Sequence, residues 1–121
     1  MSLNSQKYHA FATLILQLRD YTTTTELNAP GLRLRVASLQ QMFQQQIVPL
    51  ADEDTQIPHN SREQSYQTEM SKQLRLLELD VMFFQGARQP ATAQARLQTI
   101  SGRLTTLAQY CEAILQQAEE A

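Results

Sequence analysis

The sequence predicts an all-α fold, a small four-helix bundle, and two observations lead to this prediction. Near the C-terminus, small and aliphatic residues recur at alternating spacings of four and three, which keeps one stripe of a helix apolar over its whole length. The composition is rich in leucine, alanine, glutamine and arginine, which favour helices, whereas valine, which favours sheets, is rare. The residues of this C-terminal stripe are Ala93, Leu97, Ile100, Leu104, Leu107, Cys111, Ile114 and Ala118.

The first predicted helix covers about residues 4–21. Asn4 or Ser5 is expected to cap its start, because a short polar side chain can accept a hydrogen bond from an unpaired backbone N–H there. The threonine run at 22–25 is expected to end the helix, since β-branched hydroxyl residues favour non-helical backbone. The predicted core face consists of Tyr8, Phe11, Ile15 and Leu18, with Leu14 beside them.

The second predicted helix begins near residues 28–29 and places Pro30 in its first turn, where a missing N–H has no cost. Pro49 removes a hydrogen bond from the same helix, so we expect an end or a kink near residues 46–48. The predicted core face consists of Leu32, Val36, Leu39, Phe43, Ile47 and Leu50.

Residues 51–60 form the longest predicted break, an acidic and solvated connection. The third predicted helix then runs from residue 60 or 61 to about residue 87, and Gly86 and Pro90 are expected to close it. The fourth helix follows and extends close to the C-terminus. The core face of the third helix is predicted to contain Tyr66, Met70, Leu74, Leu77, Val81 and Phe84.

We expect one domain over residues 1–121, because a chain of this length can bury a single core but not two. Short connections after the first and third helices favour antiparallel neighbours. An up-down bundle with long third and fourth helices is therefore the simplest packing. A second arrangement stays open, in which the third and fourth helices form one long hairpin that packs against the shorter helices or against a second copy.

The third helix carries a second apolar stripe in addition to its core face. Leu76, Leu79 and Phe83 lie about 140° from that face at 3.6 residues per turn. Two interpretations are open: the helix is buried between two neighbours, or the three residues form an exposed patch that binds a second copy or another protein. Arg96 and Arg103 share a helix face and are candidates for the polar part of an interface.

Composition narrows the classes of partner and compartment. The net charge is −2 and the ten basic residues are scattered rather than gathered in a stripe, which argues against nucleic-acid binding. The first residues lack the charged and apolar regions of a signal peptide, and no apolar run is long enough to span a membrane, so we expect a soluble protein. The single cysteine, Cys111, cannot form an internal disulfide and lies on a core face, so we expect a buried, unreactive thiol and a cytoplasmic protein.

No catalytic, cofactor-binding or metal-binding signature is present, so we expect a protein that is not an enzyme. His9 lacks the basic neighbours of a phosphotransfer histidine, and the acidic segment before His59 lacks calcium-loop spacing. The alternative is a small-molecule-binding or catalytic bundle whose arginines hold carboxylates; a pocket lined by two arginines and a carboxylate or amide would support it. All arginines considered lie off the core faces, where solvation is expected, with Arg75 near Glu78: Arg19, Arg33, Arg35, Arg75, Arg88, Arg96 and Arg103.

Four segments between residues 64 and 94, QSYQTEM, KQLRLL, DVMF and ARQPATAQ, resemble a family of small cyanobacterial proteins, the heterocyst frequency control protein PatD family. The resemblance is strongest over residues 65–111. It implies a non-enzymatic regulator of how many cells become heterocysts, with a link to the division protein FtsZ. The candidate interaction site consists of the residues that lie within this block, 65–111, and point away from the predicted core: Leu76, Leu79, Phe83, Arg88 and Arg96.

Overall fold

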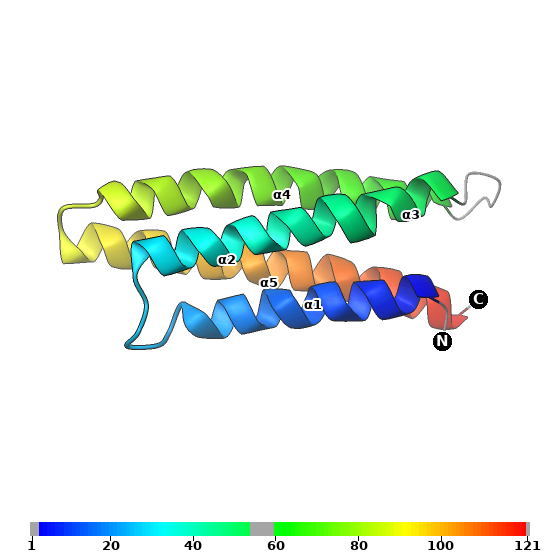
Figure 1. Ribbon diagram of the computed structural model, residues 1–121, viewed down its shortest axis with the longest axis horizontal. Coiled ribbons are helices and arrows are strands. Elements are labelled where there is room, and N and C mark those ends of the chain that lie inside the picture. The colour runs from blue at the N-terminus through cyan, green and yellow to red at the C-terminus, as the bar shows by residue number, and fades with distance from the viewer. Residues whose placement is uncertain (1–2, 54–59, 121) are drawn as a thin grey trace.

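The computed structural model describes residues 3–53 and 60–120, and the side chains of residues 4–50 and 62–117. Every regular element in these ranges is helical, which confirms the predicted all-α class. The elements are α1 (Leu3–Tyr21), α2 (Ala29–Met42), the π-helical segment η1 (Phe43–Ile47), α3 (Val48–Glu53), α4 (Asn60–Gly86) and α5 (Pro90–Glu120). In Figure 1, α2, η1 and α3 follow one another as one rod, which lies alongside α1, α4 and α5. The α1–α2 and α4–α5 connections lie at the same end of the molecule.

The core lies between the four rods and matches the predicted core faces closely. All ten core positions predicted for the first two helices are buried, and Leu14 packs partly against them. In α4 and α5 the central positions are buried, whereas Tyr66, Phe84 and Leu97 are only partly buried, as is Ala93. The side chain of Ala118 lies outside the described residues. Ring contacts join the rods, with Phe11 and Phe43 5.8 Å apart and Tyr66 and Tyr110 5.7 Å apart between ring centres.

The α1–α2 corner forms where the threonine run was expected to end the helix. The hydroxyl groups of Thr22, Thr23 and Thr24 each donate to the carbonyl three residues earlier, at 2.6 to 2.9 Å, and so satisfy the last carbonyls of α1. Asn28 caps α2 by accepting a hydrogen bond from the Gly31 N–H at 2.7 Å, and α2 begins at Ala29, within the predicted start at residues 28–29. The start of α1 differs from the prediction, because it begins at Leu3 and the two proposed capping residues lie within its first turn.

Pro49 does not end the second rod, so of the two outcomes expected near residues 46–48, an end or a kink, the end is wrong. The backbone adopts π geometry over Phe43–Ile47, in which the Val48 N–H donates to the Phe43 carbonyl, and the chain continues as α3 to Glu53. The predicted break at residue 51 therefore starts too early; residues 54–59 lie outside the described residues. A π segment adds one residue to a turn and so absorbs the missing proline N–H without breaking the rod.

A buried polar cluster, here called the amide node, lies beside this π segment. The Gln67 side-chain N–H group donates to the Ile47 carbonyl and to the Tyr8 hydroxyl, both at 2.9 Å, and the Tyr8 hydroxyl donates to Glu63 at 2.8 Å. Gln67 is 8% exposed and Tyr8 is fully buried. Burial, more than any other cause, raises the pKa of the Tyr8 phenol. The node joins α1, η1 and α4 and satisfies a carbonyl next to the irregular turn.

The α4–α5 connection is three residues long. Gly86 ends α4, as predicted, but Pro90 is the first residue of α5 rather than part of the preceding stop. This correction has a simple reason: the first turn of a helix has no use for the proline N–H, and the fixed φ of proline suits a helix start.

Candidate protein-interaction surface

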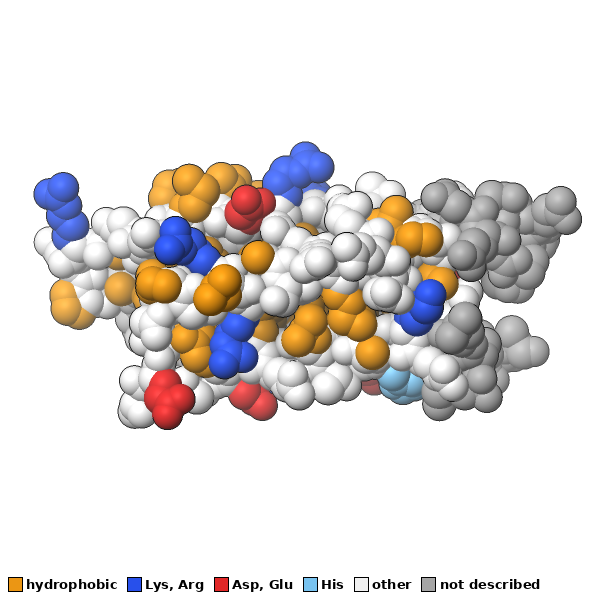
Figure 2. Space-filling model, viewed as in Figure 1, with side chains coloured by type: hydrophobic (Ala, Val, Ile, Leu, Met, Phe, Trp, Pro, Cys, Tyr) orange, Lys and Arg blue, Asp and Glu red, His pale blue; other side chains and the backbone are white. Residues whose placement is uncertain are grey.

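The outward face of α4 carries three large apolar side chains that stay in contact with solvent. Leu79 is 45% exposed, Met82 is 60% exposed and Phe83 is 58% exposed. Spacings of three and four residues place them on one side of the helix. Leu76 is half-buried at the border of the group. We call Leu76, Leu79, Met82 and Phe83 the outer apolar patch; hydrophobic side chains gather over α4 in Figure 2.

The two open interpretations of this stripe can now be compared with the structure. α4 does contact two neighbours, α2 and α5, as the first interpretation expected. Leu79 and Phe83 nevertheless stay 45% and 58% exposed, so the neighbours cover them only in part. Among the other side chains that the structure describes, large exposed apolar ones are found singly, as with Leu34 on α2 and Leu16 on α1. The outer apolar patch is therefore a feature of α4 in particular.

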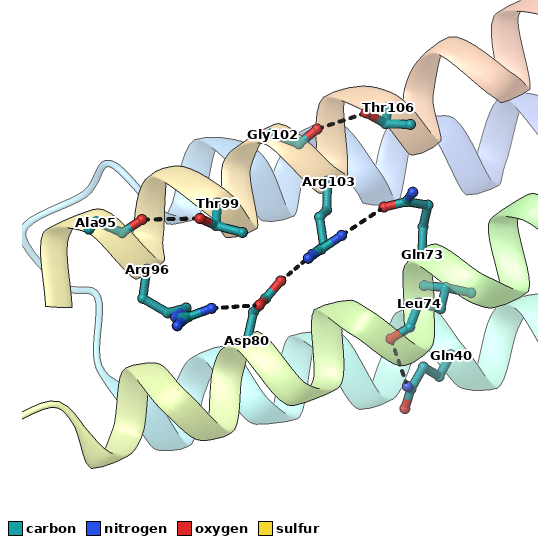
Figure 3. A network of polar contacts seen from close by, with 10 residues as sticks. All are labelled: Gln40, Gln73, Leu74, Asp80, Ala95, Arg96, Thr99, Gly102, Arg103 and Thr106. Carbon is teal, nitrogen blue, oxygen red and sulfur yellow. Dashed lines mark hydrogen bonds and ion pairs between the residues drawn. The ribbon is translucent and has the colours of Figure 1, made fainter. Parts of the chain in front are cut away.

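Asp80 follows Leu79 in α4 and binds two arginines of α5 (Figure 3). Its side chain is 4% exposed. The Arg96 guanidinium donates to Oδ1 at 3.1 Å, and Arg103 donates through Nε to Oδ2 and through NH1 to the Gln73 side-chain oxygen at 3.3 Å. We call Asp80, Arg96, Arg103 and Gln73 the ionic node. It corrects the expectation that both arginines are merely solvated, since 35% of the Arg96 side chain and 25% of the Arg103 side chain are exposed.

The ionic node fixes the position of one patch residue. The Arg96 guanidinium carbon lies 4.7 Å from the centre of the Phe83 ring, a cation–π arrangement. Because Asp80 binds the same guanidinium, Arg96 is held at one end by a buried carboxylate and presents its face to an exposed ring. An exposed aromatic side chain that is already ordered loses less conformational entropy when a partner covers it.

The remaining candidate residues do not join this group. Arg88 is exposed in the α4–α5 connection. Arg75 is exposed, but Glu78 accepts a hydrogen bond from Gln40 of α2 at 3.2 Å instead of pairing with it, which corrects the predicted ion pair. Arg33 is exposed, and Arg35 lies over the Tyr21 ring at 4.1 Å, far along the chain from the patch.

The groups considered for other chemistry have ordinary surroundings. His9 is exposed, and the acidic side chains of residues 52–54 together with His59 lie outside the described residues. Cys111 is buried, and burial raises its pKa to about 12, so the thiol stays protonated at neutral pH. Within the described ranges, no three histidine, cysteine, aspartate or glutamate side chains are grouped as metal ligands would be. No helix in these ranges has the length and apolarity to cross a membrane.

Two surface grooves among the described residues could hold a small molecule. A wide groove of about 710 Å³ lies between η1, α3 and α4 and contains Arg75, while a groove of about 290 Å³ between α1 and α5 contains Arg19. Each of these two grooves has a single arginine, whereas the alternative function requires two beside a carboxylate. The two arginines that do converge on a carboxylate bind it directly.

Sequence reasoning missed Asp80 and Met82 as parts of this surface. A signal for Asp80 was available, because a carboxylate three residues after Leu77 lies close to the core face and calls for a buried partner. Met82 lies between the two apolar stripes of the third helix by helical spacing, so its spacing assigned it to neither. Comparison of the chain with family models, curated proteins and solved structures gave no match.

Proposed function

We propose that this protein is a non-enzymatic regulator that acts by binding another protein through the outer apolar patch. The observation that carries the proposal is the exposure of Leu79, Met82 and Phe83, side by side on one helix, at 45–60%. Neighbouring apolar side chains on a surface are typical of interaction sites, whereas single ones need no explanation. Leu76 and Arg96 border these residues, and the proposed site also includes Arg88, which is exposed in the α4–α5 connection.

The arrangement of Arg96 and Phe83 supports this function. Aromatic and arginine side chains are enriched in protein interfaces and often contribute most of the binding energy. Here the two stack on each other before any partner arrives, and Asp80 holds the pair in place. A site ordered in advance binds with a smaller entropic cost.

The resemblance to the PatD family supplies the biological setting of the proposal. We propose a cytoplasmic regulator of cyanobacterial cell differentiation, with FtsZ as the partner, and an antiparallel up-down bundle as the scaffold. The shared end of the two helix connections in Figure 1 agrees with that topology. A homodimer formed through the same patch is the competing occupant.

The proposal is tested by placing a charge in the patch. Phe83→Asp and Leu79→Asp should each weaken binding to purified FtsZ by at least about tenfold, because the apolar contact is lost. Leu34→Asp is the matched control, since Leu34 is 71% exposed and lies on α2. Calorimetry gives the affinity and circular dichroism the helix content.

The outcomes separate the two parts of the proposal. Loss of binding in the patch variants alone, with unchanged helix content, supports it. If the patch variants unfold while the control folds, these residues contribute to the core and the site is wrong. If the wild type does not bind FtsZ, that partner is wrong, and the patch is then tested by selecting random peptides that bind the protein.

A further inference from the structure

The outward face of α4 is basic as well as apolar. Lys72 lies one turn before Leu76, the first residue of the outer apolar patch, Arg75 directly precedes Leu76, and both lie on the same side of the helix as the patch. Both side chains are exposed, and neither forms an ion pair with any residue that the structure describes. Basic side chains stand beside hydrophobic ones over α4 in Figure 2.

Three acidic residues lie near this face and neutralise it only in part. Glu69 is exposed one turn before Lys72 and forms no ion pair with it. Asp80 is buried and already bound by two arginines, so the ionic node carries a formal excess of one positive charge. Glu78 lies on the flank that faces α2, where it accepts the hydrogen bond from Gln40. Arg96 and Arg88 add positive charge at the far end of the patch. The exposed surface from Lys72 to Phe83 therefore combines apolar contact area with a positive potential.

The wide groove of about 710 Å³ continues this surface toward the start of α4. Lys72 and Arg75 line it together with the polar side chains of Gln64, Thr68 and Ser71. At one end of the α4 face the exposed side chains are apolar, and Arg96 lies over the Phe83 ring. At the other end the face opens into the groove, whose lining includes the side chains of Lys72 and Arg75, neither of which forms an ion pair with a described residue. A ligand that follows α4 would meet apolar contacts first and hydrogen-bond donors and positive charges afterwards.

We infer that the partner presents an acidic segment with an apolar anchor. This inference rests on the proposed function and adds the chemistry of the partner. Aliphatic or aromatic side chains of the segment cover Leu79, Met82 and Phe83, and its carboxylates lie against Lys72 and Arg75. Phe83 follows Lys72 by eleven residues, which corresponds to about 16 Å along the helix axis. About five residues of an extended chain cover the same distance.

The same charges disfavour a second copy of this chain as the occupant. Two copies joined through this face would bring Lys72, Arg75 and Arg96 of each near the corresponding cations of the other. Like charges at an interface oppose association and select against the wrong partner. The binding of an acidic segment neutralises the same charges.

A selection from random peptides tests this inference without an assumed partner. A phage library of twelve-residue peptides is panned on the wild-type protein, on Phe83→Asp, on Arg75→Glu and on Arg33→Glu. Arg33 is exposed on α2, so its reversal changes the net charge by the same amount away from the α4 face. Sedimentation of the free protein reports whether it dimerises.

We expect the selected peptides to be rich in aspartate and glutamate and to contain aromatic or aliphatic residues. Their affinity should fall about three- to tenfold in Arg75→Glu, change less than twofold in Arg33→Glu, and weaken as salt is raised. Phe83→Asp should lose the same peptides.

Different results would contradict the inference about the partner's chemistry and the proposed function. Peptides that need Phe83 but show no acidic enrichment would overturn this inference and leave the proposed function standing. Peptides that bind Phe83→Asp as well as the wild type, or no selected peptides at all, would count against both. A dimer that Phe83→Asp dissociates would assign the patch to a second copy of the chain.

Discussion

Two buried polar clusters lie on opposite sides of α4, and they differ in chemistry and in what they support. The amide node joins α4 to α1 and η1 through Gln67 and Tyr8, with neutral groups as its central donors and acceptors. The ionic node joins α4 to α5 through Asp80 and two arginines. The first satisfies a backbone carbonyl beside an irregular turn, whereas the second lies next to an exposed apolar surface.

The difference separates the part of α4 that serves the fold from the part that serves the proposed binding surface. A hydrophobic residue in place of Gln67 would remove the hydrogen bond to the Ile47 carbonyl and leave the buried Tyr8 hydroxyl without its donor, so the amide node serves the packing of α4 against α1 and the π segment. No backbone irregularity in α4 or α5 requires the ionic node. Its visible consequence is the placement of Arg96 over Phe83, which links it to the proposed binding surface.

The largest expected effect comes from removing the carboxylate of the ionic node. Asp80→Ala leaves two arginines without their shared partner, and we expect the free energy of unfolding to fall by about 2–4 kcal/mol. Partial exposure of both guanidinium groups keeps the loss below that of a fully buried pair. Urea denaturation measures the change.

Asp80→Leu sharpens the same experiment, because it fills the space with an apolar side chain while the arginines move toward water. If the node serves the surface rather than the fold, this variant should be more stable than Asp80→Ala and still lose affinity for the partner. Equal affinity of Asp80→Leu and the wild type would separate the ionic node from binding.

Much of this architecture could be predicted from the sequence, and the errors have identifiable causes. Spacing identified the core because burial follows the helical period, from Tyr8 in α1 to Ile114 in α5. The continuation past Pro49 could not be predicted, since it depends on a π turn and on a glutamine twenty residues away in sequence. The exposure of Leu79 and Phe83 was one of two open interpretations, because periodicity places a residue on a face but does not reveal what covers that face.

The ionic node was missed for a similar reason. Arg96 and Arg103 lie off the core face of α5, which is typical of solvated arginines, and the carboxylate they bind belongs to another helix. Long side chains can reach back from the edge of a helix to a buried partner. Only the packing of α4 against α5 brings these groups together.

A rise in pH should lower the free energy of unfolding, because Tyr8 of the amide node and Cys111 are both buried in their protonated forms. Burial raises the pKa of Tyr8 above its ordinary value of 10.0 and that of Cys111 from 9.0 to about 12. The unfolded chain therefore loses these protons at lower pH than the folded one. The stabilisation is complete below pH 9 and falls as pH rises, by at most about 1.4 kcal/mol per pH unit for each group.

Tyr8→Phe and Cys111→Ala each remove one of these two groups. Urea denaturation at pH 8, 9 and 10 should show a shallower fall in the free energy of unfolding for each variant than for the wild type. The ionic node contains no phenol or thiol, so Asp80→Leu should keep the wild-type dependence on pH in this range. If the free energy of unfolding of both variants falls with pH as steeply as that of the wild type, the assigned burial of both groups is wrong.

The smallest expected effect concerns the contact between Arg96 and Phe83. Arg96→Lys keeps the positive charge near Asp80 but removes the planar group that lies over the ring, so stability should fall by only about 0.5–1 kcal/mol. Arg35→Lys is a matched control, because Arg35 lies over the Tyr21 ring at 4.1 Å on another part of the surface. Both variants should lose similar stability in urea, but only Arg96→Lys should weaken partner binding, by about threefold, since only its ring belongs to the outer apolar patch. Equal binding by both variants would mean that the stacked arginine orders the surface without contributing to recognition.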